Sequence, residues 1–306
     1  MISVILETWN LVRDPDAALS TLRRQLRAMA TQLPVEDVEL IITHAGLPAT
    51  DRAQLAHEYA RPLTWLEVPA AAGFYEHKNR GFGASRGEIV VFLDGDTEPN
   101  PGWLAALTAP IARGEALVVA GHTGYPGALA ELGNLFDFPH FAAGAADTVR
   151  HFWANNVAFA RAVFATYSFP VIAPMFHGQC QVLALQLRAA GIAIRNAPAA
   201  RVTHGWPVSA RDWLEVRLLR GADARSLLPY IAEAYAPVAA PLVRGLRAVP
   251  ALALLGVRAA LGTVTALRRG PRLRGLALVA ACTVVDAVGA AAAPTVYRRL
   301  NPHASA

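Results

Sequence analysis

The sequence predicts an α/β fold with a doubly wound, mostly parallel sheet, followed by an apolar helical hairpin at the C-terminal end. Over the first hundred residues, short apolar runs alternate with segments of helical periodicity, which is typical of a parallel sheet built from βα units. Near residue 229 the composition changes to long stretches rich in Ala, Leu and Val. We therefore expect two domains, residues 1–228 and residues 229–306.

The first elements follow from the spacing of apolar residues. Four runs have the length of a buried strand, at residues 2–6, 38–42, 63–68 and 88–93. Helical patterns separate them, at residues 15–29, 49–59 and part of 73–86, and Asp14-Pro15 supplies an N-cap and first-turn pair for the first helix. Ligands of such sheets bind at the carboxyl ends of the strands, so residues 8–10 and 94–96 are candidates for a functional site.

The pattern after Pro101 is less regular. It predicts helices at residues 104–111, 176–190 and 211–228, and extended segments at residues 116–120 and 192–202. Residues 121–151 are rich in Gly, Pro, Phe and His and are expected to face a substrate.

The composition argues against several classes of protein. With 54% hydrophobic and 17% charged residues among 306, the chain is expected to be neither disordered nor a coiled coil. Its two cysteines, Cys180 and Cys282, suggest neither a disulfide framework nor a zinc site. The first residues show no signal-peptide pattern, so we expect the chemistry to take place in a reducing cytosol.

The net charge of +5 is divided unevenly along the chain. Residues 231–306 carry nine arginines against Glu233 and Asp286, a net charge of +7, and the first 230 residues carry −2. A basic excess confined to an apolar tail suits anionic lipid better than nucleic acid. We therefore expect an anionic membrane surface as a partner, and no nucleic acid.

The clearest chemical motif is Asp94-Gly95-Asp96, which follows the apolar run Ile89–Leu93. Two carboxylates separated by a small residue can present oxygen ligands to Mg²⁺ or Mn²⁺, which proteins usually hold with one or two carboxylates and the phosphates of a substrate. The alternative is a surface turn, since Asp-Gly is also a common turn dipeptide.

Four segments carry a resemblance to a known family: residues 3–10, Lys78-Asn79-Arg80-Gly81, residues 84–96 and residues 99–104. Their order and spacing closely resemble those of the family 2 glycosyltransferases, which have the GT-A fold and use nucleotide-sugar donors. The resemblance covers residues 1–228. It implies a metal-dependent, inverting transfer with Mn²⁺ or Mg²⁺ as the cofactor.

The resemblance also implies roles at the donor. Asp94 would contact the ribose or the diphosphate, and Asp96 would bind the metal that stabilises the leaving diphosphate. His204 would complete the metal site or serve as a structural histidine. The other residues that we expect at the donor are Glu7, which stands where many members have proline, Thr8, Asn10, Asn79, Arg217 and Arg220.

Some donor residues have an alternative interpretation. Asn79 would equally well cap a helix. Arg217 and Arg220 lie on one face of a predicted helix with Trp213, and arginine suits the geometry of a diphosphate, but surface salt bridges would give the same pattern.

Two asparagines mark the acceptor side. The segment Trp153–Phe159 resembles the acceptor segment of the family, so Asn155 or Asn156 would hydrogen-bond a sugar hydroxyl. Turn formation explains an Asn pair equally well.

The catalytic base is where the sequence departs from the family. Most members carry a Glu-Asp pair, the Glu lying twelve residues before a glycine. Counting back from Gly191 places Gln179 and Cys180 at that pair, so we expect Gln179 on the acceptor side. A carboxylate is the usual base, and a thiol of ordinary pKa is mostly protonated, so we expect Cys180 to be structural. His177 is the other candidate base, and the base stays unassigned.

The tail contains two helical stretches, residues 248–267 and 275–297, each near the length that spans a bilayer. Arg247, Arg258 and Arg269 are spaced by eleven residues, which places them in one stripe along a helix. Four arginines in the short turn would oppose the positive-inside tendency if the hairpin crossed the membrane. We therefore expect the tail to lie in the plane of the cytosolic membrane face, with packing onto the first domain as the alternative.

Together these features predict transfer of a sugar from a nucleotide-sugar donor to a glycan or a lipid-linked acceptor. A non-catalytic relative that binds a donor or a glycan fits the missing carboxylate pair. A membrane adaptor whose tail carries the function is a further alternative. A nucleotidyltransferase would need a glycine-rich basic loop after the first strand, which residues 7–11 do not provide.

Overall fold

The computed structural model describes residues 1–9, 15–32, 37–127, 130–138, 147–205, 209–246, 248–268 and 272–301. Its internal contacts divide the chain into two compact units. Unit 1 consists of Met1–Gly124, Gly144–Val171 and Gln186–Gly205, and unit 2 of Tyr125–Ala143, Ile172–Leu185 and Trp206–Ala306.

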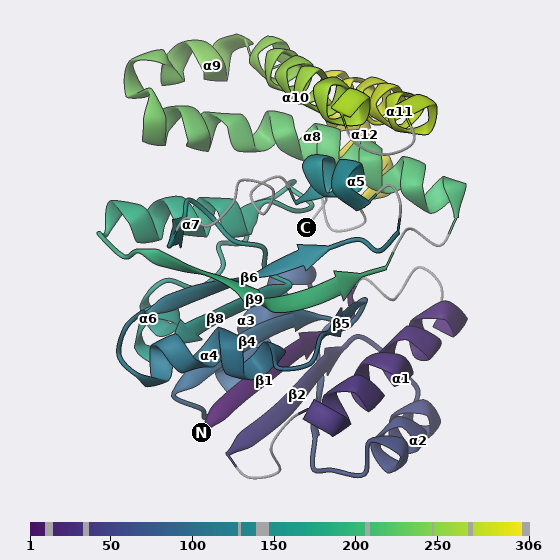
Figure 1. The fold of residues 1–306 in the computed structure, drawn as a ribbon, viewed down its shortest axis with the longest axis vertical. Helices are drawn as coiled ribbons and strands as arrows, with labels where there is room; N and C mark the ends of the chain where they lie inside the picture. Colours follow the sequence, from purple (N-terminus) through teal and green to yellow (C-terminus); the bar gives the residue numbers. More distant parts are fainter. Residues whose placement is uncertain are drawn as a thin grey trace. The chain divides into compact units, whose positions relative to one another are not determined.

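Unit 1 is built on a mixed, mostly parallel sheet, which confirms the predicted fold class (Figure 1). Its strands among the described residues are β1 (Ile2–Glu7), β2 (Val38–His44), β3 (Thr64–Glu67), β4 (Ile89–Asp94), β5 (Thr97–Pro99), β6 (Val118–Gly124), β7 (Thr148–Val149), β8 (Asn156–Ala160) and β9 (Ile194–His204). They run in the order β3-β2-β1-β4-β8-β6-β9-β5, with β7 beside β9. Strands β3, β2, β1 and β4 are parallel, and β8 pairs antiparallel to β4 and β6.

Helices cover both faces of this sheet. They are α1 (Pro15–Gln32), α2 (Ala49–Tyr59), α3 (Phe74–Ala84), α4 (Trp103–Ala112) and α6 (Arg161–Thr166). Leu22 of α1, Leu55 of α2 and Trp103 of α4 share one buried core with Val4 and Val91. Because β1 and β4 are buried along almost their whole length, their sequences are continuous apolar runs, which is why they could be predicted.

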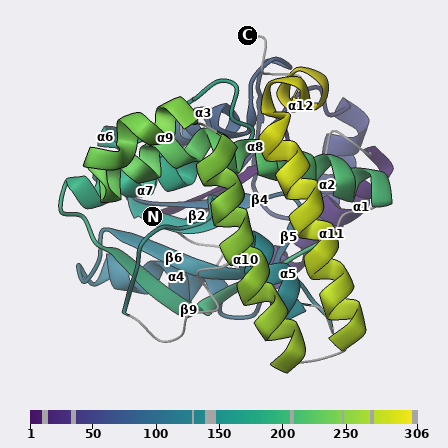
Figure 2. The same ribbon diagram turned by 90° about the horizontal axis from the view of Figure 1, so that it is seen from above.

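Unit 2 is helical among its described residues. Its helices are α5 (Ala130–Asp137), α8 (Ala210–Tyr235), η3 (Pro237–Ala239), α9 (Ala240–Leu246), α10 (Ala248–Arg268), α11 (Arg272–Ala291) and α12 (Ala293–Leu300), and α7 (Gln179–Ala189) begins in it. Helices α10 and α11 lie side by side as the predicted hairpin (Figure 2). The second predicted helix is divided at Ala292, because Pro294 begins a new helix. The predicted domain boundary at residue 228 lies within α8.

Two glycines let α8 and α11 approach closely within unit 2. A Cβ atom on Gly221 of α8 would overlap the backbone carbonyl of Asp286, and one on Gly289 of α11 would overlap the carbonyl of Leu218. The backbones therefore touch where the side chains of Arg217 and Asp286 meet.

We expect Gly221→Ala to lower the free energy of unfolding by about 1–3 kcal/mol, because the added methyl group must push two helix backbones apart. Gly256→Ala in α10 is the matched control: nothing lies within 4 Å of its Cβ position, so its effect should be neutral or stabilising by up to about 1 kcal/mol. Chemical denaturation of both variants checks this. Equal stability of the two would contradict the close approach.

Candidate functional site

The candidate site lies in unit 1, where β1 and β4 end side by side. Glu7 is the last residue of β1 and Asp94 the last of β4, and the two are partners in the strand register. Gly95 donates its backbone N–H to the carbonyl of Glu7 at 2.8 Å. The carbonyl of Asp94 accepts from Gln25 of α1 at 2.7 Å and from Thr97 at 2.8 Å. The strand ends are therefore held rigidly.

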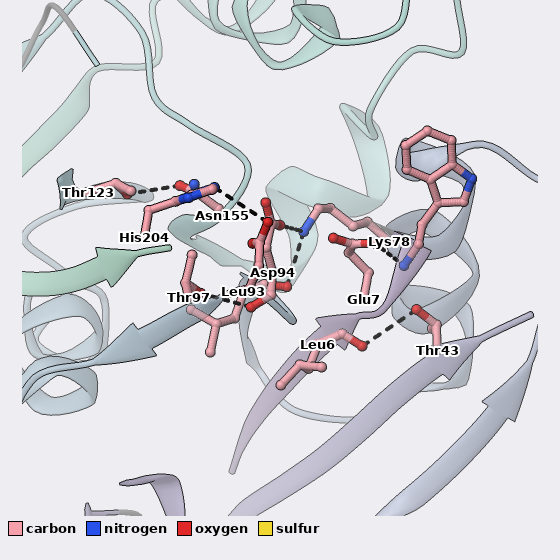
Figure 3. Close-up of polar contacts among 12 residues, drawn as sticks. Leu6, Glu7, Thr43, Lys78, Leu93, Asp94, Thr97, Thr123, Asn155 and His204 are labelled. Atoms are coloured by element: carbon pink, nitrogen blue, oxygen red, sulfur yellow. Dashed lines mark hydrogen bonds and ion pairs between the residues drawn. The ribbon is translucent and has the colours of Figure 1, made fainter. Parts of the chain in front are cut away.

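A buried lysine of α3 holds the end of β4 beside Glu7 (Figure 3). The Lys78 side chain is fully buried; its Nζ donates to Asp94 Oδ1 at 2.6 Å and to the carbonyl oxygen of Leu93 at 3.2 Å. It also lies 4.7 Å from the ring centroid of Phe74. The sequence interpretation quoted Lys78 within a motif but gave it no role. Its signal was that it is the only lysine in an arginine-rich chain.

Lys78 is one cation for two buried carboxylates. Burial, and then the charge of Asp94, raise the pKa of Glu7 well above its ordinary value, and Lys78 acts against this. Burial also raises the pKa of Asp94, whose hydrogen bond to Lys78 favours the charged form. Glu7 Oε2 accepts the backbone N–H of Trp9 at 2.7 Å. Of the two acids, Asp94 is therefore the one whose charge Lys78 compensates by a direct hydrogen bond.

Asp96 and His204 meet on the other side of the Asp94-Gly95-Asp96 turn. His204 ends β9, where it is paired in register with Thr97, and its Nε2 lies 3.6 Å from Asp96 Oδ2. Its Nδ1 lies 2.7 Å from the carbonyl oxygen of Gly205, which assigns the proton of the neutral ring to Nδ1. Nε2 of the neutral ring then turns a lone pair toward a carboxylate, an arrangement that suits a cation.

The structure thus brings together Asp96 and His204, the two metal ligands predicted from the sequence. Asp96 Oδ1 is buried and has no hydrogen-bond partner among the described residues. Within that part of the chain, no three His, Cys, Asp or Glu side chains gather into a metal-binding group. A metal here would therefore need further ligands from a substrate, as Mg²⁺ and Mn²⁺ commonly do.

The predicted donor residues of the first strand edge are only partly described. Thr8 is buried and its hydroxyl donates to the carbonyl of Thr43 at 2.9 Å. Asn10 lies outside the described residues.

For Asn79, the structure favours a structural role over the donor. Its Nδ2 donates to the carbonyl of Phe169 at 2.8 Å, and its Oδ1 accepts from the N–H of Phe169 at 3.2 Å. Both polar atoms therefore hold a backbone segment, and the donor role of Asn79 stays a prediction.

The two asparagines of the acceptor segment differ. Asn155 is buried and accepts a hydrogen bond from the Thr123 hydroxyl at 2.8 Å. Asn156 is fully buried; its Oδ1 accepts from Trp103 Nε1 at 2.8 Å and its Nδ2 donates to the carbonyls of His122 and Ala200. Asn156 is therefore committed to the core, and only Asn155 remains a candidate.

The arginines predicted for the donor belong to unit 2, where acids engage them. Arg217 is 2% exposed; it forms a two-point ion pair with Asp286 and contacts Asp137. Arg220 lies 3.1 Å from Asp137. The predicted donor role of Arg217 would therefore require this enclosed ion pair to open. The sequence could not show this, since Asp286 lies 69 residues away.

The residues at the predicted base position are also in unit 2. Gln179 begins α7 and its Nε2 donates to the carbonyl of Met175 at 2.9 Å, a bond that an ionised Glu could not donate. Cys180 is a buried thiol in the reduced form. His177 precedes them, and its backbone N–H donates to Asp223 Oδ2 at 2.8 Å.

Comparison with known proteins identifies the family. The profile of the family described as Glycosyl transferase family 2 matches residues 3–176, more than half of the chain. The chain belongs to glycosyl transferase family 2. This confirms the resemblance inferred from the sequence, and the GT-A fold with it.

Two solved structures share the fold of this family 2 chain. The Pyrobaculum calidifontis mannosyltransferase PcManGT, solved with GDP-Man and Mn²⁺, matches with a TM-score of 0.60 and 17% identity, over 99% of this chain and 84% of that one. Residues 1–349 of S. aureus TarS match with a TM-score of 0.51 and 16% identity, over 97% and 91%.

A curated relative from Drosophila melanogaster is 33% identical over 92 residues. Its name is "Putative inactive polypeptide N-acetylgalactosaminyltransferase 11", and the match spans 30% of this chain and 16% of that protein.

We expect Lys78→Met to lower the free energy of unfolding by about 3–5 kcal/mol, because it leaves Asp94 buried without its cation. The matched control is Arg24→Met, which breaks a surface ion pair with Glu98. The Arg24 side chain is 59% exposed and the Glu98 side chain 46%. That pair is worth about 0–1 kcal/mol. Urea unfolding at neutral pH measures both, and a loss in Lys78→Met no larger than in the control would contradict the role assigned to Lys78.

Proposed function

We propose that this family 2 member is a metal-dependent, inverting glycosyltransferase. It moves a sugar from a nucleotide-sugar donor to a glycan or a lipid-linked acceptor at the cytosolic face of a membrane. The observation that supports this most is the pairing of Asp96 with His204 at the strand ends, beside an Asp94 that Lys78 holds in place.

The residues present fit Mn²⁺ or Mg²⁺. The buried Oδ1 of Asp96, which has no hydrogen-bond partner in the described part of the chain, is a hard oxygen ligand, and the Nε2 lone pair of His204 is an acceptable ligand for Mn²⁺. Asp96 and His204 would hold the ion together with the donor diphosphate. When bound, the ion supplies Lewis-acid stabilisation of the charge that develops on the leaving diphosphate. Mn²⁺ and GDP-Man occur together in the structure of the Pyrobaculum mannosyltransferase.

The remaining donor contacts come from the strand ends themselves. Asp94, fixed by Lys78, presents a carboxylate that can accept a hydroxyl hydrogen bond from the donor ribose. Glu7, whose raised pKa favours the protonated carboxyl, can donate a hydrogen bond to a donor oxygen in a site where a carboxylate would repel the diphosphate. Thr8 lies at the same edge. These groups orient the donor before the sugar is transferred.

The acceptor hydroxyl needs a base, and we propose His177. Gln179 cannot take up a proton near neutral pH, and the Cys180 thiol is buried. An imidazole can take the acceptor proton at neutral pH. Asn155 is the proposed hydrogen-bonding partner for an acceptor hydroxyl.

A second function has an observation in its favour. Gln179 and Cys180 replace the carboxylates of the family, and the name of the Drosophila relative calls that protein inactive. A non-catalytic chain that binds a donor or a glycan would show metal-dependent nucleotide binding without turnover. Release of nucleoside diphosphate from a panel of nucleotide sugars separates the two functions.

We expect Asp96→Asn to lose the Mn²⁺-dependent part of the affinity for a nucleoside diphosphate, because an amide oxygen is a weaker ligand than a carboxylate. The matched control is Glu98→Gln, two residues further along, where the carboxylate forms a surface pair with Arg24. Calorimetry with UDP and with GDP, with and without Mn²⁺, measures the effect. Equal Mn²⁺-dependent affinity in Asp96→Asn and wild type would exclude Asp96 as a ligand.

The membrane part of the proposal rests on how the hairpin is turned. Helices α10 and α11 are long and apolar enough to cross a bilayer, although core helices of soluble proteins pass the same test. Their charged side chains within the helices, Arg258 and Asp286, turn toward α5 and α8: Asp286 pairs with Arg217, and Arg258 lies 3.4 Å from the carbonyl of Phe136. Large apolar side chains are exposed instead, namely Val249, Leu252, Leu254, Val257, Leu261, Val264, Leu267, Leu273, Val284 and Val288.

This arrangement corrects one detail of the sequence interpretation. Arg258 does not belong to an outward basic stripe, because it packs inward against α5, and Arg247 and Arg269 lie outside the described residues. The outward basic residues sit instead at the helix ends, at Arg268, Arg272 and Arg274. An apolar face bordered by arginines suits the plane of an anionic bilayer surface.

We expect the triple variant Arg268→Glu, Arg272→Glu, Arg274→Glu to bind anionic vesicles about two orders of magnitude more weakly, at roughly 1 kcal/mol per arginine. A control with the same charge change is Arg86→Glu, Arg113→Glu, Arg195→Glu, at exposed positions of unit 1. Co-sedimentation with phosphatidylglycerol vesicles compares them. Equal binding of the two triple variants would mean that net charge, and not the hairpin ends, directs the protein to lipid.

A further inference from the structure

The segment that carries His177 is held by a buried carboxylate of α8. Asp223 Oδ1 accepts the backbone N–H of Phe176 and Asp223 Oδ2 accepts the N–H of His177, both at 2.8 Å. Asp223 is 6% exposed. One side chain therefore fixes two consecutive peptide groups just before α7 begins.

The C-terminal helix α12 completes the same contact. The hydroxyl of Tyr297 lies 2.9 Å from Asp223 Oδ1 and also 2.9 Å from Ser226 Oγ. Immediately after α12, Asn301 Nδ2 donates to the carbonyl of Pro174 at 2.9 Å. Burial and the neighbouring Asp223 raise the pKa of Tyr297, so its hydroxyl stays protonated and can donate to the carboxylate.

A sharp turn follows the fixed peptides. Gly178 has φ +108, a conformation that side-chain-bearing residues rarely adopt, and Gln179 bonds back to Met175. The conformation of residues 175–179 is thus fixed by their contacts with α8 and α12.

We propose that Asp223 and Tyr297 are positioning residues for transfer: through them, α12 holds residues 175–179 in the conformation in which His177 serves the acceptor. This inference rests on the proposed function, because it gives His177 the part of the base. On this proposal, α12 in the tail supports the acceptor side of the site, in addition to the membrane contact proposed for α10 and α11. Neither residue needs to touch a substrate.

The charges around the carboxylate support a measurable titration. Asp223 faces the two backbone N–H groups of residues 176 and 177, the Tyr297 hydroxyl of α12, and Arg220 one turn earlier on α8, and Arg225 lies near Tyr297. Burial raises the pKa of Asp223 to about 7, against the effect of these donors. Below that pH the carboxyl takes up a proton and becomes a weaker acceptor for both amides.

The first arm of the test reads the contact itself. In wild-type protein the amide resonances of Phe176 and His177 should shift with a midpoint near pH 7. Asp223→Asn should abolish this titration, and His177→Gln should keep it for Phe176, which separates the carboxyl from the imidazole. An unchanged titration in Asp223→Asn would overturn the proposal.

The second arm reads the part played in transfer. Tyr297→Phe removes one hydroxyl, and its matched control is Tyr230→Phe on α8, where the ring is 37% exposed. The assay measures hydrolysis of a nucleotide sugar that the wild-type protein accepts as a substrate, with water as the acceptor. Tyr297→Phe should lower kcat about tenfold or more, because a misplaced catalytic group loses activity on this scale. KM for the donor should stay unchanged, because donor contacts lie in unit 1.

The outcomes separate this inference from the proposed function. Amide hydrogen exchange at Phe176 and His177 reports whether Tyr297→Phe loosens the contact. If exchange becomes faster but kcat stays within twofold of the Tyr230→Phe control, the contact is structural only. That result would overturn this inference and leave the proposed function standing. Absence of turnover in wild-type protein for every donor would overturn the proposed function and with it the role in transfer, even if the amide titration is seen.

Discussion

The buried contact between the Lys78 amine and the Asp94 carboxylate is the interaction on which the candidate site depends. Two acidic side chains end neighbouring parallel strands, and their charges would repel each other in a place that water does not reach. A lysine from α3 compensates one of them and ties the helix to the end of β4. Removing either partner of such a pair leaves an uncompensated buried charge, which proteins tolerate poorly.

Because of this contact, the two aspartates of the Asp94-Gly95-Asp96 turn have different roles. Asp94 is bonded to Lys78, whereas Asp96 has one oxygen without a partner among the residues that the structure describes, and its other oxygen faces a histidine nitrogen. Because the described residues offer only this pair, a metal ion would depend on substrate phosphates for its other ligands. Metal and nucleotide would therefore bind together, which suits a site that must release its diphosphate product.

The sequence predicted those features that depend on residues close together along the chain. The apolar runs of β1 and β4 could be predicted because burial on both faces of a strand leaves a continuous hydrophobic pattern. Strand β7 has two residues and β5 has three, too short to leave a pattern. Roles set by distant partners were also out of reach: the phenylalanine backbone that engages Asn79 lies 90 residues away, and Asp286 lies 69 residues from Arg217. The structural contacts of Asn79 and Arg217 could not be predicted for this reason.

The central claim is that Asp96 and His204 hold a cation with the donor diphosphate. Electron spin echo spectroscopy of Mn²⁺ in the presence of UDP or GDP tests this directly, because a nitrogen bonded to the ion gives a characteristic coupling. The account predicts an imidazole nitrogen coupling in wild-type protein that disappears in His204→Asn. A Mn²⁺–nucleotide complex without nitrogen coupling, or with a coupling that survives in His204→Asn, would contradict it.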